Sequence, residues 1–247
     1  FAMMALGEIG GQEARGFLFR MVRRASNRLD RTFAAMGLGV MGYQARGEDK
    51  VEFADIGRAF HRRFNNVKAM DEKAAFAISM ALMGYTGAAE EIRKIVQTSH
   101  GEAKYRGHMC IALGLMNDSR AISVVREQVR SREDIDLRRS AGIALGLLGD
   151  RDAVQVLEDE LEKSASSMAV HGAVAQGLGF IGDVSAVAPL KAMVTKRTEF
   201  QDGTRAFAAV ALGLLGDKDD LPLMRNLISA HNNYLVRTYA IGEVITI

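Results

Sequence analysis

Basic side chains recur at one position of a repeating pattern, where they could bind anions. They stand eight residues before glycines, or the equivalent slot, that lie about one repeat apart: Arg31, Arg106, Arg138, His171, Arg205 and Arg237. A guanidinium group binds a carboxylate or a phosphate through two parallel hydrogen bonds. Such a basic ladder would therefore suit an acidic peptide or the backbone of a nucleic acid.

The spacing of the ladder also fits a structural role. Its members share a helical stripe with the small and apolar residues expected in the core. Polar side chains stand one turn before each position, including Asn27, Glu72, Glu102, Asp134 and Gln201. Side chains four residues apart on a helix are neighbours, and such a pair can tie a helix start to itself or to the next repeat. We therefore interpret the ladder as structural and keep anion binding as the alternative.

Residues that could support catalysis, metal binding or cofactor binding are not grouped in any pattern of that kind. The chain has one cysteine, Cys110, and five scattered histidines without an H-E-x-x-H motif. Two stretches, 37–42 and 177–182, match G-x-G-x-x-G. That motif binds a dinucleotide only between a strand and a helix N-terminus, whereas these glycines are expected near helix C-termini. We assign no catalytic residue, no metal ligand and no cofactor.

Internal repetition determines the fold that must position these residues. A pattern of a small residue, an apolar residue and glycine, followed by a second glycine or asparagine, recurs along the chain. Its first glycines are Gly7, Gly39, Gly84, Gly114, Gly146, Gly179 and Gly213, and Ile245 takes the eighth slot. Five of the seven steps between these slots are 32 to 34 residues long. A period of this length is typical of stacked helix pairs.

Each unit is expected to contain an amphipathic outer helix and a nearly apolar inner helix. Residues 153–161 place apolar side chains on one face and charged ones on the other, while 134–148 are apolar or small almost all round. The second glycine should end the inner helix with a positive φ. This expectation applies to Gly42, Gly87, Asn117, Gly149, Gly182 and Gly216.

Residues 137–161, LRRSAGIALGLLGDRDAVQVLEDEL, resemble the HEAT-like repeat of the phycobilisome-lyase type. The resemblance extends over the chain and implies an all-α, armadillo-like fold: a right-handed α-solenoid of about seven to eight HEAT-like helix pairs. It implies little about function, since such repeats occur in scaffolds, adaptors, chromophore lyases and a few enzymes. HEAT-like iron hydroxylases use His-Glu pairs, and this sequence contains no His-Glu dipeptide.

The expected domain organisation is a single repeat array over residues 1–247. Both ends of the sequence fall inside expected helices, so we expect a fragment of a longer chain. The step from Gly39 to Gly84 is 45 residues, and we therefore predict an atypical unit at 43–68 with an inserted loop at 43–52. Insertions in repeat proteins map to one face, often the binding face.

Charge and hydropathy exclude some function classes. The net charge of +2 is small for a nucleic-acid-binding protein, so we interpret the clusters around Arg20–Arg28 and Arg58–Arg63 as solvated faces. No apolar stretch approaches the roughly 20 residues of a membrane span. We expect no membrane span, a cytoplasmic location and no nucleic acid partner.

The inner helices should line a concave surface, which is the best candidate for a binding site. Its expected partner-binding residues are Phe33, Met36, Lys104, His108, Gln176, Phe207 and Tyr239. Exposed aromatic and methionine side chains on such a surface suit a protein or a peptide. We therefore predict a non-enzymatic scaffold or adaptor that binds a partner on this face. An enzyme or enzyme subunit of the chromophore-lyase kind, and nucleic-acid binding through the basic ladder, stay open as alternatives.

Overall fold

The computed structural model describes residues 2–45, 49–99, 102–131, 134–163 and 168–216. These residues form α-helices and two 3₁₀ turns, and no strand occurs among them. The helices are α1 (Ala2–Ile9), α2 (Gln12–Arg24), α3 (Arg28–Gln44), α4 (Asp49–Asn66), α5 (Met70–Leu82), α6 (Ala89–Thr98), α7 (Ala103–Leu115), α8 (Ile122–Arg130), α9 (Ile135–Leu147), α10 (Ala153–Lys163), α11 (Met168–Ile181), α12 (Val187–Thr195) and α13 (Asp202–Gly216).

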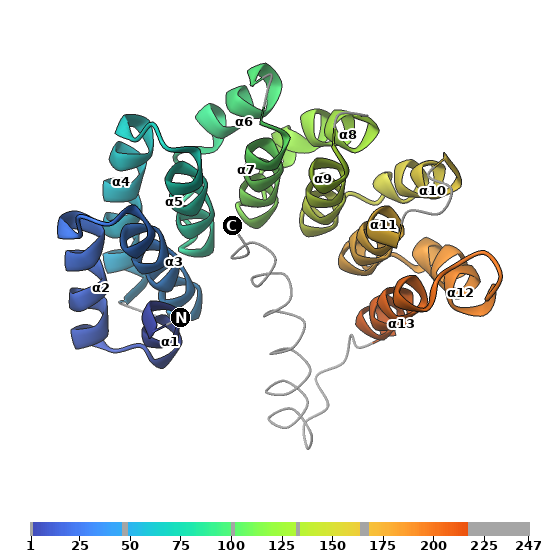
Figure 1. The fold of residues 1–247 in the computed structure, drawn as a ribbon, viewed down its shortest axis with the longest axis horizontal. Helices are drawn as coiled ribbons and strands as arrows, with labels where there is room; N and C mark the ends of the chain where they lie inside the picture. Colours follow the sequence, from blue (N-terminus) through green and yellow to red (C-terminus); the bar gives the residue numbers. More distant parts are fainter. Residues whose placement is uncertain (1, 46–48, 100–101, 132–133, 164–167, 217–247) are drawn as a thin grey trace.

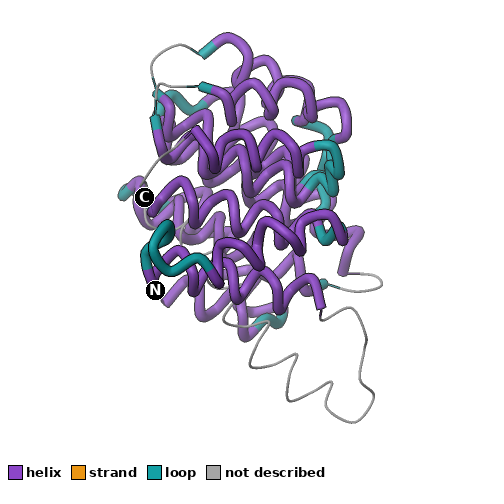
Figure 2. The backbone as a smooth tube through the Cα atoms, turned by 90° about the vertical axis from the view of Figure 1, so that its right-hand side faces the viewer, coloured by secondary structure: helices purple, strands orange, loops and turns teal. Residues whose placement is uncertain are grey.

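The helices stack in pairs to form an arc (Figure 1). The even-numbered helices α2 to α12 lie on its outer side, and the odd-numbered helices α1 to α13 lie on its inner side. Figure 2 shows the same stack from the side, with the loops gathered at its two edges. The prediction of an all-α solenoid is confirmed: the described residues contain six outer–inner pairs preceded by the single inner helix α1. The eighth predicted unit lies outside the described residues.

The two kinds of helix differ in burial as their sequences predict. In α6 the apolar side chains Ala89, Ile92 and Val96 are buried, while charged side chains occupy the opposite face. In α7 every residue from Tyr105 to Gly114 is buried. An outer helix needs one covered face, whereas an inner helix packs against its own outer helix and against the inner helices before and after it.

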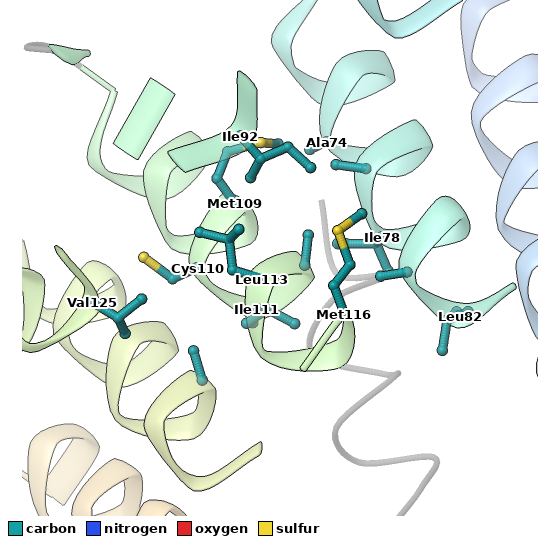
Figure 3. Close-up of a cluster of buried hydrophobic side chains, with 14 of the residues drawn as sticks. Ala74, Ile78, Leu82, Ile92, Met109, Cys110, Ile111, Leu113, Met116 and Val125 are labelled. Atoms are coloured by element: carbon teal, nitrogen blue, oxygen red, sulfur yellow. The ribbon is translucent and has the colours of Figure 1, made fainter. Parts of the chain in front are cut away.

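The core is continuous from one unit to the next. Figure 3 shows side chains of α5, α6 and α7 meeting in one layer, with Ile78 of α5, Ile92 of α6 and Met109 of α7 among them. All three side chains are essentially inaccessible to solvent. Since each layer is shared by neighbouring units, no unit buries its apolar face by itself.

Glycines allow the inner helices to approach each other closely. A Cβ atom on Gly146 of α9 would lie 2.5 Å from the Cβ of Phe180 and 2.7 Å from the carbonyl oxygen of Gly177, both on α11. A Cβ on Gly114 of α7 would similarly lie 3.0 Å from the carbonyl oxygen of Ala144 on α9. In these two units the first glycine of the repeat therefore acts through packing.

The second glycine ends the inner helix in only some units. Asn117, Gly149 and Gly182 have φ values of 53°, 64° and 67°, which confirms the prediction of a left-handed C-cap at these positions. The prediction is wrong for Gly87, because α5 ends at Leu82 and Gly84 takes the positive φ of 75°.

The second unit departs from the pattern in another way. Gly42 is a buried residue within α3, which continues to Gln44, so the predicted C-cap at Gly42 is also wrong. In the last unit described, Gly216 is still part of α13. These differences have one cause: the inner helices have unequal lengths, and the cap moves with the last helical residue.

In the atypical unit, helices extend into both ends of the segment 43–52, where we predicted an inserted loop. Tyr43 and Gln44 belong to α3, and α4 begins at Asp49. The helices α3 and α4 have 17 and 18 residues, against 10 and 13 for α6 and α7. The loop prediction is therefore wrong for these residues. The physical reason is that Phe53, Ile56, Phe60 and Phe64 of α4 are all buried, so the outer helix gains a longer apolar stripe.

Candidate functional site

The first member of the basic ladder, Arg31, makes four hydrogen bonds. Its Nε donates to Oε1 of Glu72 at 2.8 Å, and its Nη2 donates to Oε2 of the same carboxylate at 3.1 Å. Its Nη1 donates to the carbonyl oxygens of Ala25 and Ser26, each at 3.0 Å. Glu72 is buried at the start of α5, so this guanidinium joins the end of α2 to the next repeat.

Two further ladder arginines contact the equivalent part of their own units. Nη1 of Arg106 donates to the carbonyl oxygen of Ser99 at 2.9 Å, and Nε of Arg205 donates to that of Val194 at 3.0 Å. The last carbonyl groups of a helix have no donor within the helix, and a cation near them is favourable. Arg31, Arg106 and Arg205 therefore each satisfy a carbonyl group at or just after the end of the preceding outer helix.

The remaining ladder positions lie within the repeat stack as far as the structure describes them. Arg138 is half-buried and lines a hollow of about 10 Å³ together with Val129, Leu157 and Val170. His171 is buried, with its ring centroid 5.2 Å from that of Phe200 in an edge-on arrangement. Arg237 lies outside the described residues. These contacts favour the structural interpretation of the ladder.

The concave positions differ in their exposure. Lys104 is exposed, and the side chains of Phe33, Gln176 and Phe207 are half-buried. These residues come from α7, α3, α11 and α13, so they are spread over most of the inner side of the arc (Figure 1). Tyr239 lies outside the described residues.

Two of the expected concave contacts are buried, and for them the prediction of an exposed binding position is wrong. Met36 is only 4% exposed, and its sulfur accepts a hydrogen bond from the hydroxyl of Ser79 on α5 at 3.6 Å. His108 is 7% exposed. The inner helices approach each other so closely that a side chain expected to face solvent is instead covered by its neighbours.

Burial changes the protonation of His108. Its pKa is lowered to about 4, mainly by desolvation and to a smaller extent by the nearby cations Lys104 and Arg139, while Asp136 acts in the opposite direction. The imidazole is therefore neutral at pH 7. A neutral, buried histidine contributes packing and hydrogen bonding and carries no charge for a ligand.

His108 should make the stability of the protein depend on pH. An unfolded histidine takes up a proton below pH 6.5, whereas the folded one resists protonation down to about pH 4. The folded protein therefore keeps its full stability with respect to His108 above pH 6.5, and it loses stability as the pH falls towards 4 because the unfolded state binds the proton more tightly. Linkage predicts a loss of about 2 kcal/mol between pH 7.5 and pH 5.

Urea unfolding of the wild type and of His108→Gln at several pH values measures this effect. The difference in unfolding free energy between the two proteins should change by that amount over the interval, while other groups titrate equally in both. Parallel pH profiles would show that His108 titrates with an ordinary pKa in the folded state.

Two further titratable groups of α7, Tyr105 and Cys110, are also uncharged at pH 7. Burial raises the pKa of the Cys110 thiol to about 12, and it raises the pKa of Tyr105 to about 12. Thiolate is the reactive form of cysteine, so Cys110 is an inert apolar residue here. In the described part of the chain, no three His, Cys, Asp or Glu side chains are gathered so that they could hold a metal ion.

Two ion pairs between neighbouring units were not predicted from the sequence. Arg93 of α6 pairs with Asp118, and Arg126 of α8 donates to Asp150 at 2.7 Å and 2.5 Å. In the next unit the equivalent Asp183 instead accepts a hydrogen bond from the backbone N–H of Ser185. The signal was present in the sequence, because the two arginines are 33 residues apart and the two aspartates are 32 apart.

Comparison with known proteins agrees with this architecture. Residues 89–171 and 125–201 match the family model for HEAT repeats. A similar solved structure is that of human deoxyhypusine hydroxylase in complex with glycerol, with 16% sequence identity and a TM-score of 0.45. The match covers 87% of this chain and 78% of that one. No curated protein matches the chain. None of the described helices is long and apolar enough to cross a membrane.

Proposed function

Because residues 89–171 and 125–201 match HEAT repeats, we propose that this chain is an interaction scaffold that binds another protein along the concave side of the solenoid. The observation that carries the proposal is the partial exposure of Phe33, Lys104, Gln176 and Phe207 on four inner helices. Aromatic anchors combined with polar side chains are typical of protein interfaces. Their separation over several units suits an extended partner.

The chromophore-lyase alternative has less support. The hollow beside Arg138 has a volume of about 10 Å³, which is room for a single water molecule. Among the polar groups of the inner helices, Cys110 and His108 are both neutral at pH 7 because of their burial. A lyase would need a pocket that fits a chromophore and a group that can act as an acid or a nucleophile.

Nucleic-acid binding through the ladder is also less favoured. The guanidinium groups of Arg31, Arg106 and Arg205 donate hydrogen bonds to backbone carbonyl groups of their own units. A phosphate would have to compete with these bonds. The ladder is therefore better suited to holding helix ends in place than to contacting a nucleic acid backbone.

Site-specific photo-crosslinking tests the scaffold proposal. A photoreactive amino acid at Gln176 on the concave side should capture a defined protein, and the same group at exposed Ser123 on outer helix α8 should not. The captured protein is then purified and its affinity is measured by calorimetry. We expect Lys104→Glu with Gln176→Glu to weaken binding by about tenfold or more.

The matched control changes two exposed outer-helix residues, Thr98→Glu with Ser123→Glu, and makes the net charge more negative by two units, against three for the concave variant. Its affinity should stay within about twofold of the wild type, as expected for residues outside the interface. Equal affinities of the concave variant and the wild type would place the partner elsewhere on the molecule.

A further inference from the structure

Two stretches near the start of the chain contain basic residues and no acidic ones. Residues 14–29 and 56–70 together carry nine Lys and Arg and no Asp or Glu. The whole chain, by contrast, has nearly equal numbers of the two signs, 32 and 30. The positive charge of the protein is therefore concentrated in these two stretches.

The fold places the two stretches side by side. They form the later parts of α2 and α4 and the loops that lead into α3 and α5. At the loop edge, Arg28 pairs with Asp71 at 3.1 Å, which ties the start of α3 to the start of α5. At the opposite edge, Arg15 of α2 pairs with Glu52 of α4 and lies 5.9 Å from the ring centroid of Phe53. Figure 1 shows α2 and α4 as neighbours on the outer side.

Several cations on this surface have no acidic partner. Within the residues that the structure describes, Arg20, Arg24, Arg62 and Arg63 form no ion pair, and the Nε of Arg63 is buried without a hydrogen-bond partner. Arg20, Arg24 and Arg62 are exposed. Most other arginines of the described chain are paired: examples are Arg58 with Asp55, Arg93 with Asp118, Arg126 with Asp150 and Arg139 with Asp136.

This surface also offers an apolar contact. Phe17 is 41% exposed and lies one turn before Arg20 and two turns before Arg24 on the same face of α2. We define Phe17, Arg20, Arg24, Arg62 and Arg63 as the basic surface. Guanidinium groups match carboxylates in geometry, and an exposed aromatic ring suits an apolar side chain among them.

The size of the basic surface favours a short ligand. Acidic side chains lie at the beginning of both helices, Glu13 on α2 and Glu52 and Asp55 on α4. Double-stranded DNA carries one charge about every 1.7 Å and needs a long basic stripe, which these acids would interrupt. An acidic peptide can place a few consecutive carboxylates against the arginines alone, since an extended residue spans only about 3.4 Å.

We propose that the basic surface of α2 and α4 binds an acidic segment of a protein partner. The geometry that carries the proposal is the adjacency of two acid-free helix ends whose exposed arginines form no ion pair with any residue that the structure describes. This site is separate from the concave side, since it lies on outer helices. The proposal therefore stands or fails independently of the scaffold function.

Fluorescence anisotropy with a defined probe tests this proposal. The probe is a fluorescein-labelled peptide of eight glutamates with one central phenylalanine, and it is titrated with the full chain. We expect the triple variant with Arg20→Glu, Arg24→Glu and Arg62→Glu to weaken probe binding by about tenfold or more. The reason is that the variant places negative charges opposite the glutamates of the probe, and like charges across an interface are unfavourable. The replaced side chains are exposed, and thermal melting monitored by circular dichroism checks that the variant is folded.

A matched control reverses three other cations without ion-pair partners in the described chain, Arg130, Lys191 and Arg197. This control alters the net charge equally, so its affinity for the probe should stay within about twofold of the wild type if the site is local. The concave variant Lys104→Glu with Gln176→Glu should also bind the probe normally.

Three outcomes would overturn the proposal. An equal loss in the control variant would show a non-specific charge effect. Tighter binding of a 20-base-pair DNA duplex would assign the surface to nucleic acid, and tighter binding of phosphatidylserine vesicles would assign it to a membrane. If the charge-reversed protein does not fold, the variant with glutamine at the same three positions gives the same comparison.

Discussion

Replacing Arg31 with alanine is expected to lower the free energy of unfolding by about 3 kcal/mol, the lower end of the range for a broken buried pair. The reason is the carboxylate that the substitution leaves behind. Glu72 has a side chain that is 4% exposed, and both of its oxygens accept hydrogen bonds from Arg31. Without the guanidinium, a buried negative charge has lost its partner. Chemical unfolding followed by circular dichroism measures the loss.

The neighbouring pair of Arg28 and Asp71 provides a matched control. It joins the same two helices three residues earlier in α3, but Arg28 is 54% exposed. Arg28→Ala should therefore cost only about 0–1 kcal/mol, as surface pairs do. Adding Glu72→Gln to Arg31→Ala should recover part of the lost stability, because it removes the buried charge.

These measurements also test the interpretation of the whole ladder. A structural ladder predicts that Arg31→Ala, and likewise Arg138→Ala, lowers stability while partner binding per folded molecule is preserved. If Arg31→Ala unfolded at the same denaturant concentration as the wild type and bound a partner less tightly, the ladder would be a binding site.

Gly146→Ala is expected to destabilise the protein by about 3 kcal/mol, at the upper end of the cost of overpacking a core. The added methyl group would lie 2.5 Å from the Cβ of Phe180 and 2.7 Å from the carbonyl oxygen of Gly177. Neither atom belongs to a flexible side-chain end, so the helices α9 and α11 would have to separate. Thermal and chemical unfolding both report the change.

Gly16→Ala on α2 is the control for this substitution. Its Cβ would meet only the flexible guanidinium of Arg20, at an ordinary 3.5 Å. Alanine has a higher helix propensity than glycine, so this change should stabilise the protein by roughly 0.5–1 kcal/mol. If Gly146→Ala also stabilised the protein, helix propensity rather than interhelical packing would determine the effect of Gly146.

The repeat pattern predicted the stacked helix pairs because it reflects the packing directly. A small residue is needed wherever two inner helices approach, so glycines at a fixed period mark the contact points in the sequence itself. The pattern did not predict how far each helix extends. Gly84 took the C-cap expected at Gly87, since helix length depends on how many apolar residues the neighbouring helix can cover.

The candidate site was less predictable than the fold. The sequence placed Met36 and His108 on the inner side, but it could not indicate that adjacent helices would cover both. Exposure depends on interhelical distance, which no local pattern encodes. The ion pairs between units were not predicted, although Arg93 and Arg126 stand 33 residues apart and Asp118 and Asp150 stand 32 apart in the sequence.

Besides its own outer helix, each inner helix contacts the inner helices before and after it in the stack: α1 with α3, α3 with α5, and so on to α11 with α13. Native contacts therefore join residues about one repeat apart, and folding can begin in any unit without closing a long loop. By the same reasoning, a terminal unit can detach while the others keep their contacts. A ligand that spans several units would oppose this peeling, because it binds only the intact stack and its binding free energy adds to the stability of the whole array.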